Sequence, residues 1–249
     1  MSNLANFDFS GARVLVTGGS NGIGAAISKA FADAGAEVLI TGTRASAAEY
    51  EGDLSAYEYR QLELSDKAAI EALAGSLERL DVLVNNAGCN FPGGKHESVP
   101  DVFEESVGIN LFGAYRLSIG CREKLRTSEL EGGASVVNLA SMGAFHAVPI
   151  VPGYGAAKAG TVQMTKTLAA TWAADGIRVN AIAPGLIESN MTKLMKGVEP
   201  LEKPFIERTP LGRWGVPDDI APVVLFLASS SARFMTGQTI SVDGGYSIT

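Results

Sequence analysis

Two spacings of apolar residues alternate along the chain. Short runs rich in β-branched residues, such as RVLVT at 13–17 and DVLVN at 81–85, are followed by longer stretches with apolar residues at helical spacing. The runs are typical of strands buried on both faces, and the longer stretches are typical of helices that cover a sheet. The alternation therefore predicts an α/β protein with a parallel sheet and helices on both of its faces.

The pattern predicts seven strands in one domain. We expect strands at 13–17, 37–41, 57–62, 81–85, 134–139, 178–182 and 239–242, and helices at 22–34, 66–77, 102–125, 154–174 and 218–227. Residues 186–208 interrupt the alternation and follow the end of a strand, where open sheets bind ligands, so we expect a substrate lid there. A pair of surface helices without a gating role is the alternative for this segment.

Composition excludes several classes of protein. With 46% hydrophobic and 19% charged residues, the chain can form a packed core. Its net charge of -7 offers no general attraction for nucleic acid. The sequence has no secretion signal or membrane-spanning stretch, and two cysteines with two histidines give no metal-ligand spacing, so we expect no membrane partner, no metal and a cytoplasmic location.

A glycine-rich turn lies between the first strand and the first helix. The sequence TGGSNGIG at 17–24 places Gly18, Gly22 and Gly24 where the backbone can approach a diphosphate at the helix N-terminus. The spacing differs from the common dinucleotide fingerprint. A tight turn that only lets strand and helix pack closely is the alternative interpretation.

The residues after the second strand bear on the choice of cofactor. Dinucleotide-binding folds often carry a carboxylate here to hold the adenosine ribose, but the segment at 41–44 has none. Arg44 and Thr43 can instead bind a 2′-phosphate. We therefore expect NADP, with NAD possible, and an ordinary solvated arginine is the alternative for Arg44.

Tyr154 and Lys158 form the candidate proton-transfer pair. Their separation of four residues puts both on one face of a predicted helix. A free phenol titrates near pH ~10, and we expect the Lys158 ammonium to lower the pKa of Tyr154. Ser141 follows the fifth strand and can hold a substrate oxygen. A helix that merely begins with an exposed tyrosine and lysine is the alternative.

Taken together, TGGSNGIG, NNAG at 85–88, Asn110, Ser141, YGAAK at 154–158 and PG at 184–185 resemble the classical short-chain dehydrogenase/reductase family over nearly the whole chain. This resemblance implies a single-domain, doubly wound Rossmann fold and hydride transfer between nicotinamide C4 and a carbonyl or alcohol carbon. It also implies that Tyr154 exchanges the proton, Lys158 also binds the nicotinamide ribose, Ser141 positions the substrate and Asn110 holds a water in a proton relay.

The resemblance further implies a homotetramer and a set of cofactor contacts. Three positions depart from the family pattern: Glu63 is often Asp, Asn21 is often Arg or Lys in NADP-dependent members, and Ser189 is often Thr. The implied cofactor residues are Gly18, Ser20, Asn21, Gly22, Ile23, Gly24, Thr43, Arg44, Glu63, Leu64, Asn86, Ala87, Gly88, Tyr154, Lys158, Pro184, Gly185, Ile187 and Ser189.

The substrate is expected to be a secondary alcohol or ketone of a small, mostly apolar molecule. Ser141, Met142, His146, Leu186 and Met191 are the predicted substrate residues, and Phe91, Val148, Ile150 and Met195 would add to an apolar wall. A 3-oxoacyl-carrier-protein reductase is an alternative, but Glu129, Glu131 and Asp175 would repel an acidic carrier, although Arg122, Lys124 and Arg126 lie nearby. A non-enzymatic NADP(H)-sensing regulator is the alternative from another class.

Overall fold

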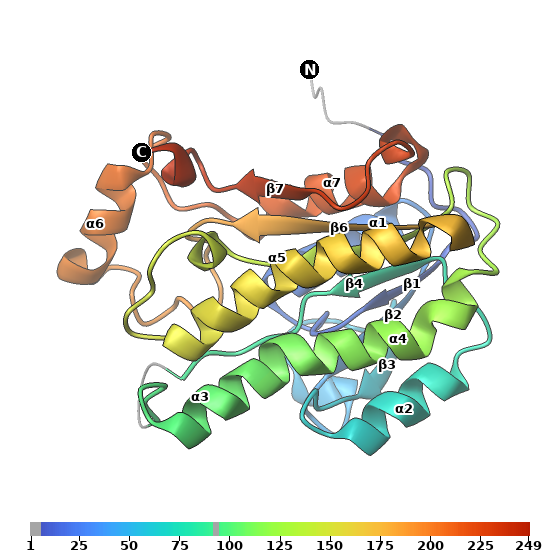
Figure 1. Ribbon diagram of the computed structural model, residues 1–249, viewed down its shortest axis with the longest axis horizontal. Helices are drawn as coiled ribbons and strands as arrows, with labels where there is room; N and C mark the ends of the chain where they lie inside the picture. The colour runs from blue at the N-terminus through green and yellow to red at the C-terminus, as the bar shows by residue number, and fades with distance from the viewer. Residues whose placement is uncertain (1–5, 92–94) are drawn as a thin grey trace.

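The fold is a seven-stranded parallel sheet covered by helices on both faces (Figure 1). The computed structural model describes residues 6–91 and 95–249. The strand order is β3-β2-β1-β4-β5-β6-β7. The strands are β1 (Arg13–Val16), β2 (Glu37–Gly42), β3 (Glu58–Gln61), β4 (Val82–Asn85), β5 (Ala134–Leu139), β6 (Ile177–Pro184) and β7 (Thr239–Val242). The predicted α/β fold is confirmed.

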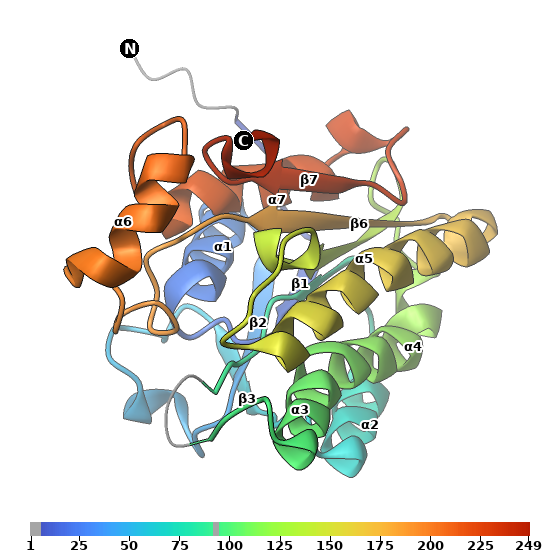
Figure 2. The same ribbon diagram turned by 60° about the vertical axis from the view of Figure 1, so that its left-hand side comes forward.

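The helices form one layer on each side of this sheet. Helices α1 and α7 cover one face, and α2, α4 and α5 cover the other (Figures 1 and 2). The α-helices are α1 (Gly22–Asp33), α2 (Lys67–Ser76), α3 (Pro100–Val107), α4 (Ala114–Leu125), α5 (Pro152–Trp172), α6 (Glu199–Arg208) and α7 (Pro217–Ala228). None of the helices in the described ranges is long and apolar enough to cross a membrane.

Alternating residues of β1, one of the inner strands, pack against the two helical layers. Val14 and Val16 of β1 pack in the core under α1 and α7, whereas Leu15 packs with Leu117 and Trp172 on the opposite face. Successive side chains of a strand point to opposite faces, so a strand between two helical layers must be apolar throughout. This is the physical basis of the uninterrupted apolar runs in the sequence.

Two predicted stretches differ from the structure in detail. The single helix expected at 102–125 is α3 and α4 joined by a π-helical turn, Gly108–Gly113, which the spacing of apolar residues did not indicate. The interrupted segment at 186–208 contains one helix, α6, instead of a helix pair. α6 lies at the edge toward which the arrowheads of β6 and β7 point (Figure 1).

A buried arginine ties β6 to the end of α7. Arg178 is 6% exposed, and its guanidinium has no carboxylate partner among the described residues. It donates instead to backbone carbonyls, namely those of Gly132, Leu227, Ala228, Ser229 and Ala232. Because the last carbonyls of a helix lack intrahelical partners, Arg178 satisfies the C-terminus of α7 from outside.

Candidate active site

A cavity of about 970 Å³ runs along the carboxyl edge of the sheet. The strand order reverses between β1 and β4, so the loops that follow these two strands diverge and leave a crevice at this edge. The turn after β1, the loops after β2, β3, β4, β5 and β6, the start of α5 and Phe205 of α6 all contribute to its wall. Ligand-binding residues far apart in the sequence therefore meet here.

The glycine-rich turn forms one wall of this cavity at a point too crowded for side chains. A Cβ on Gly24 would lie 2.1 Å from the Gly18 carbonyl oxygen, and Gly18 itself has φ +64°. The Asn86 side-chain amide donates to the carbonyls of Thr17 at 2.9 Å and Gly18 at 3.2 Å, which ties this turn to the loop after β4. Since the Asn21 side chain makes no capping bond to α1, the first N–H groups of that helix are open to an anion.

The opposite end of the cavity is lined by residues that follow β2 and β3. Thr43, Glu63 and Leu64 line it as expected, and so does Tyr50, which the sequence analysis missed. Arg44 lies outside the lining: its guanidinium stacks 4.7 Å from the Tyr50 ring centroid, and its backbone N–H donates to the Tyr50 hydroxyl at 3.0 Å. All the other predicted cofactor residues line the cavity.

Three of the four predicted catalytic residues meet in the middle of the cavity. Ser141, Tyr154 and Lys158 line it, whereas Asn110 lies behind the wall and is 2% exposed. The Asn110 amide donates to the carbonyls of Cys89 at 2.8 Å and Ser106 at 2.9 Å, and its oxygen accepts the Cys89 N–H at 3.1 Å. The side chain of Asn110 thus holds the loop after β4.

Gly88 allows this close arrangement. A Cβ at that position would lie 2.5 Å from the Asn110 side-chain oxygen and 3.6 Å from Lys158 Nζ. Only a residue without a side chain lets the loop pass between Asn110 and Lys158. A steric requirement therefore explains the glycine at the last position of NNAG.

The expected lowering of the Tyr154 pKa is wrong for the protein alone. Burial raises the pKa of Tyr154, Glu97 and Cys89 raise it further, and the hydrogen bond with Ser141 opposes them. Lys158 Nζ lies 5.5 Å from the Tyr154 ring centroid and donates to the Leu139 carbonyl at 2.6 Å. Burial lowers the pKa of Lys158 to about 8. For both residues, the cost of burying the charged form outweighs the attraction between phenolate and ammonium that their spacing in the sequence suggested.

The substrate end of the cavity differs from the sequence expectation in a few residues. Met142, Leu186 and Met191 line it, together with Val148 and Met195. The predicted substrate residue His146 lies outside the lining, where its ring packs edge-on against Tyr246 and its Nδ1 is 3.4 Å from Arg208. Phe91 and Ile150 do not line the cavity either, and Val151, Leu194 and Phe205 do. Among the described residues, the only charged side chains in the whole lining are Glu63 and Lys158.

Comparisons with known proteins agree with this arrangement. A family model described as enoyl-(acyl carrier protein) reductase matches residues 18–247. The chain belongs to the short-chain dehydrogenase/reductase family. Members of this family act on CH–OH groups as dehydrogenases and reductases, so the chain is an oxidoreductase of that type and the non-enzymatic sensor is set aside.

Individual short-chain dehydrogenases/reductases resemble the chain over nearly its full length. A 2-dehydro-3-deoxy-D-gluconate 5-dehydrogenase of Bacillus subtilis is 34% identical, with 96% of each chain covered. A 3alpha-hydroxysteroid dehydrogenase of Mediterraneibacter gnavus is 34% identical, covering 92% of this chain and 94% of the relative. The solved complex of Pseudomonas aeruginosa RhlG with NADP has a TM-score of 0.86 and 32% identity, covering 97% of this chain and 98% of RhlG.

Proposed function

We propose that this enzyme uses NADP(H) to interconvert a secondary alcohol and a ketone on a small, mostly apolar molecule. The observation that carries the proposal is one continuous cavity with a glycine-rich anion cradle at one end and an uncharged pocket at the other. Ser141, Tyr154 and Lys158 lie between these two ends.

The residues present fit a dinucleotide. The side-chain-free turn at Gly18 and Gly24 and the uncapped N-terminus of α1 are suited to a diphosphate, and the residues after β2 and β3 would hold the adenosine. When bound, NADP(H) supplies the hydride acceptor or donor. Thr43 lines this end of the cavity, and Arg44, although outside the lining, stacks on the cavity residue Tyr50, so the two could hold a 2′-phosphate from this side. The solved RhlG structure with NADP supports the same choice.

The chain's own residues can handle the proton of this reaction. Tyr154 keeps its proton at neutral pH because burial raises its pKa, so it can donate to the oxygen of a ketone. The Ser141 hydroxyl can hold that oxygen beside the phenol. Lys158 Nζ, 5.5 Å from the Tyr154 ring centroid, keeps a positive charge that favours the phenolate formed when Tyr154 gives its proton to a ketone. In the reverse reaction this phenolate accepts the proton of the alcohol.

The lining of the substrate end supports a neutral substrate. A sugar acid or a coenzyme A thioester would bring negative charge, which is costly to bury without a cation. The described residues of this end provide none, and three methionines, Met142, Met191 and Met195, provide an adaptable apolar wall. Of the relatives above, the steroid dehydrogenase is named for the more similar kind of substrate.

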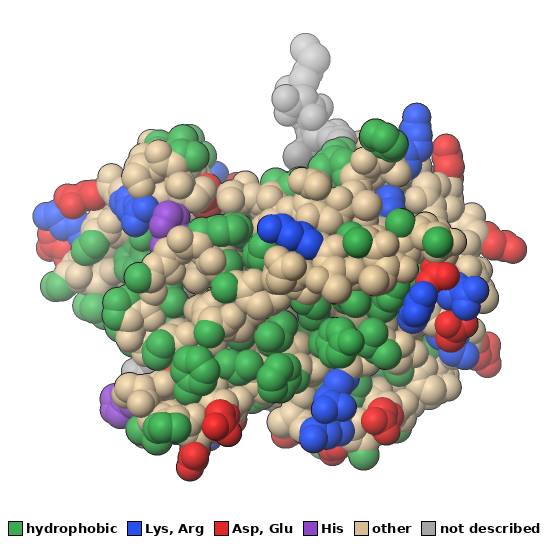
Figure 3. All heavy atoms as spheres, viewed as in Figure 1, with side chains coloured by type: hydrophobic (Ala, Val, Ile, Leu, Met, Phe, Trp, Pro, Cys, Tyr) green, Lys and Arg blue, Asp and Glu red, His purple; other side chains and the backbone are tan. Residues whose placement is uncertain are grey.

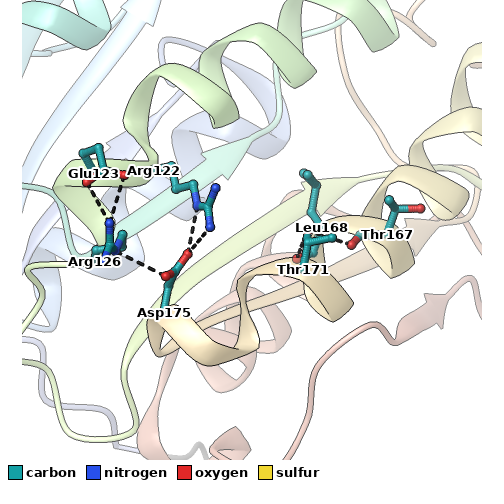
Figure 4. A network of polar contacts seen from close by, with 7 residues as sticks. All are labelled: Arg122, Glu123, Arg126, Thr167, Leu168, Thr171 and Asp175. Carbon is teal, nitrogen blue, oxygen red and sulfur yellow. Dashed lines mark hydrogen bonds and ion pairs between the residues drawn. The ribbon is translucent and has the colours of Figure 1, made fainter.

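An acyl carrier protein is a poor fit for the expected docking surface. Asp175 pairs with Arg122 at 2.5 Å and with Arg126 at 3.3 Å, and Arg126 also pairs with Glu123 at 3.0 Å (Figure 4). Two of the three basic residues that could have attracted an acidic carrier, Arg122 and Arg126, are therefore already paired with the chain's own carboxylates. This supports a free small molecule over a carrier-bound acyl chain.

Three further features belong to the proposal. Residues 186–208 serve as a substrate lid, since Met191, Leu194, Met195 and Phe205 of this segment line the cavity. The enzyme forms a homotetramer through the π-helical turn and α4, where Phe112, Tyr115 and Ile119 are exposed at helical spacing. Figure 3 shows hydrophobic side chains gathered on this face of the molecule. It works in the cytoplasm, in keeping with the free thiols of Cys89 and Cys121.

A substrate panel tests the proposal. Purified enzyme is mixed with NADPH and neutral ketones, sugar acids or coenzyme A thioesters, and loss of reduced nicotinamide is followed by absorbance. We expect turnover of neutral ketones, a fall in kcat of about 10²–10⁴-fold in Tyr154→Phe, and unchanged turnover in the matched control Tyr57→Phe, which removes the hydroxyl of a tyrosine outside the cavity lining. Activity confined to the acids, or equal rates in both variants, would contradict it.

A further inference from the structure

A buried carboxylate lies beneath the start of α5, outside the machinery described so far. Glu97 is only 1% exposed and precedes α3. One of its oxygens accepts the backbone N–H of Tyr154 at 2.8 Å, and the other accepts the Ser106 hydroxyl at 3.1 Å. Both oxygens of the carboxylate are thus occupied by donors from two different helices.

The N–H that Glu97 accepts is one that α5 cannot satisfy itself. The first N–H groups of a helix have no intrahelical partner, and Tyr154 is the third residue of α5. The N-cap residue Val151 makes no side-chain capping bond, and the first turn of α5 contains no acidic residue. Glu97 therefore supplies, from another segment, the negative charge and acceptor that favour a helix N-terminus.

The fit between α3 and the start of α5 is close. A Cβ on Gly153 would lie 3.1 Å from the Glu97 carboxylate, 3.0 Å from the Phe103 carbonyl oxygen and 3.1 Å from Ser106 Cβ. A glycine directly before Tyr154 lets the backbone of α5 rest against Glu97. The contact thus fixes the residue that carries the proposed proton donor.

The same carboxylate reaches Asn110 through one side chain. Ser106, which donates to Glu97, accepts the Asn110 amide on its carbonyl at 2.9 Å, with its hydroxyl 3.4 Å from the same nitrogen. Asn110 in turn holds the backbone of Cys89. A continuous series of hydrogen bonds thus runs from the Tyr154 backbone through Glu97 and Ser106 to the loop after β4.

We propose that Glu97 is a positioning residue for the reaction, which holds Tyr154 at a fixed height in the cavity relative to Asn110 and the loop after β4. This inference rests on the proposed function, because positioning matters only if Tyr154 exchanges a proton with substrate. A displacement of about 1 Å at such a residue can cost about 10²-fold in rate.

The charge of Glu97 also acts on the Tyr154 side chain. The groups that face Tyr154 are Glu97, Cys89, Ser141 and Lys158. Glu97 and Cys89 raise the Tyr154 pKa, and the Ser141 hydrogen bond lowers it. Removing the charge while keeping the shape should therefore lower the apparent pKa of the catalytic acid.

Three variants separate the effect of Glu97 on the position of Tyr154 from the effect of its charge on the Tyr154 pKa. Glu97→Ala removes both, Glu97→Gln keeps an acceptor for the Tyr154 N–H, and the control Glu105→Gln removes an exposed carboxylate of α3 that pairs with Lys95. With a ketone turned over by the wild type, we expect kcat of Glu97→Ala to fall about 10–100-fold while NADPH affinity stays within about threefold. Glu97→Gln should recover most of kcat, with a lower apparent pKa in its kcat/KM profile, and Glu105→Gln should match the wild type.

Hydrogen exchange at the start of α5 tests the contact without any turnover. We expect the backbone amides of this peptide to exchange faster in Glu97→Ala than in Glu105→Gln. If Glu97→Ala fails to fold, Ser106→Ala replaces it, and we expect the same faster exchange in that variant. A wild-type kcat in Glu97→Ala, a Glu97→Gln profile that coincides with the wild type, or equal exchange in all variants would overturn the inference. Absence of wild-type turnover with every ketone would instead refute the proposed function, and exchange would still decide the role of Glu97.

Discussion

Replacing Lys158 by methionine should abolish catalysis and stabilise the fold at the same time. Lys158 is 4% exposed, and its ammonium has one hydrogen-bond partner among the described residues, the Leu139 carbonyl. Burying a charge with so little compensation lowers stability, and methionine fills a similar volume without the charge. The substitution therefore exposes the energetic cost of keeping an ammonium beside Tyr154.

The size of the effect follows from the pKa of the buried amine. A change from 10.5 to about 8 corresponds to about 3 kcal/mol, at about 1.4 kcal/mol for each unit. The variant also loses the hydrogen bond to the Leu139 carbonyl, which lowers the free energy of unfolding by about 1–2 kcal/mol and offsets part of this gain. The net gain in the free energy of unfolding at neutral pH is therefore about 1–2 kcal/mol, or a rise in Tm of about 2–8 °C for a chain of this size.

The pH dependence gives the sharper test. Between the folded pKa of about 8 and the unfolded value of 10.5, the unfolded wild type binds more protons at Lys158, so its stability rises with pH over that range. Calorimetry without cofactor should show Lys158→Met melting above the wild type at pH ~7, with the gap narrowing toward pH ~10. A Tm at or below that of the wild type, or a gap independent of pH, would refute the reasoning.

Three further outcomes are expected. Arg44→Ala should weaken NADP binding by about 10-fold or more and leave NAD nearly unchanged, as measured by fluorescence titration, because only NADP carries the 2′-phosphate; equal losses would reverse the choice of cofactor. Gly24→Ala should abolish binding of either cofactor, because its Cβ would collide with the Gly18 carbonyl; a normal dissociation constant would contradict this. Arg178→Ala should lower the free energy of unfolding, measured by urea denaturation, by about 2–4 kcal/mol, because the last carbonyls of α7 lose their hydrogen-bond donors. A loss below about 0.5 kcal/mol would show that these hydrogen bonds contribute little.

Most of the fold could be predicted from the sequence, because a strand buried on both faces must be apolar and a helix covering it must be amphipathic. The π-helical turn at Gly108–Gly113 could not, since its residues continue the helical spacing on either side. α6 was missed because its ten residues, Glu199–Arg208, include two prolines and five acidic or basic side chains, so few apolar residues are left to show the helical period.

In the site too, residues within sequence motifs could be predicted, whereas residues brought there by tertiary packing could not. The glycine-rich and YGAAK motifs are local, and the structure brings Gly18, residues 20–24, Tyr154 and Lys158 of these motifs into one cavity. Glu97 and Tyr50 lie in segments without a motif, and only the folded chain reveals the burial of one and the cavity position of the other. The pKa of Tyr154 was wrongly predicted because sequence spacing places Lys158 nearby but says nothing about burial or the Leu139 carbonyl.

The π-helical turn makes this part of the enzyme sensitive to chain length. An α-helix rotates by about 100° per residue, so deleting one residue from Gly108–Gly113 would turn α3 by about that angle relative to α4. Asn110 would then leave the Cys89 backbone, and Ser106 would leave Glu97. Residues 51–53 are exposed and lie outside the cavity lining, so variants that shorten the chain should be tolerated there and rejected between α3 and α4.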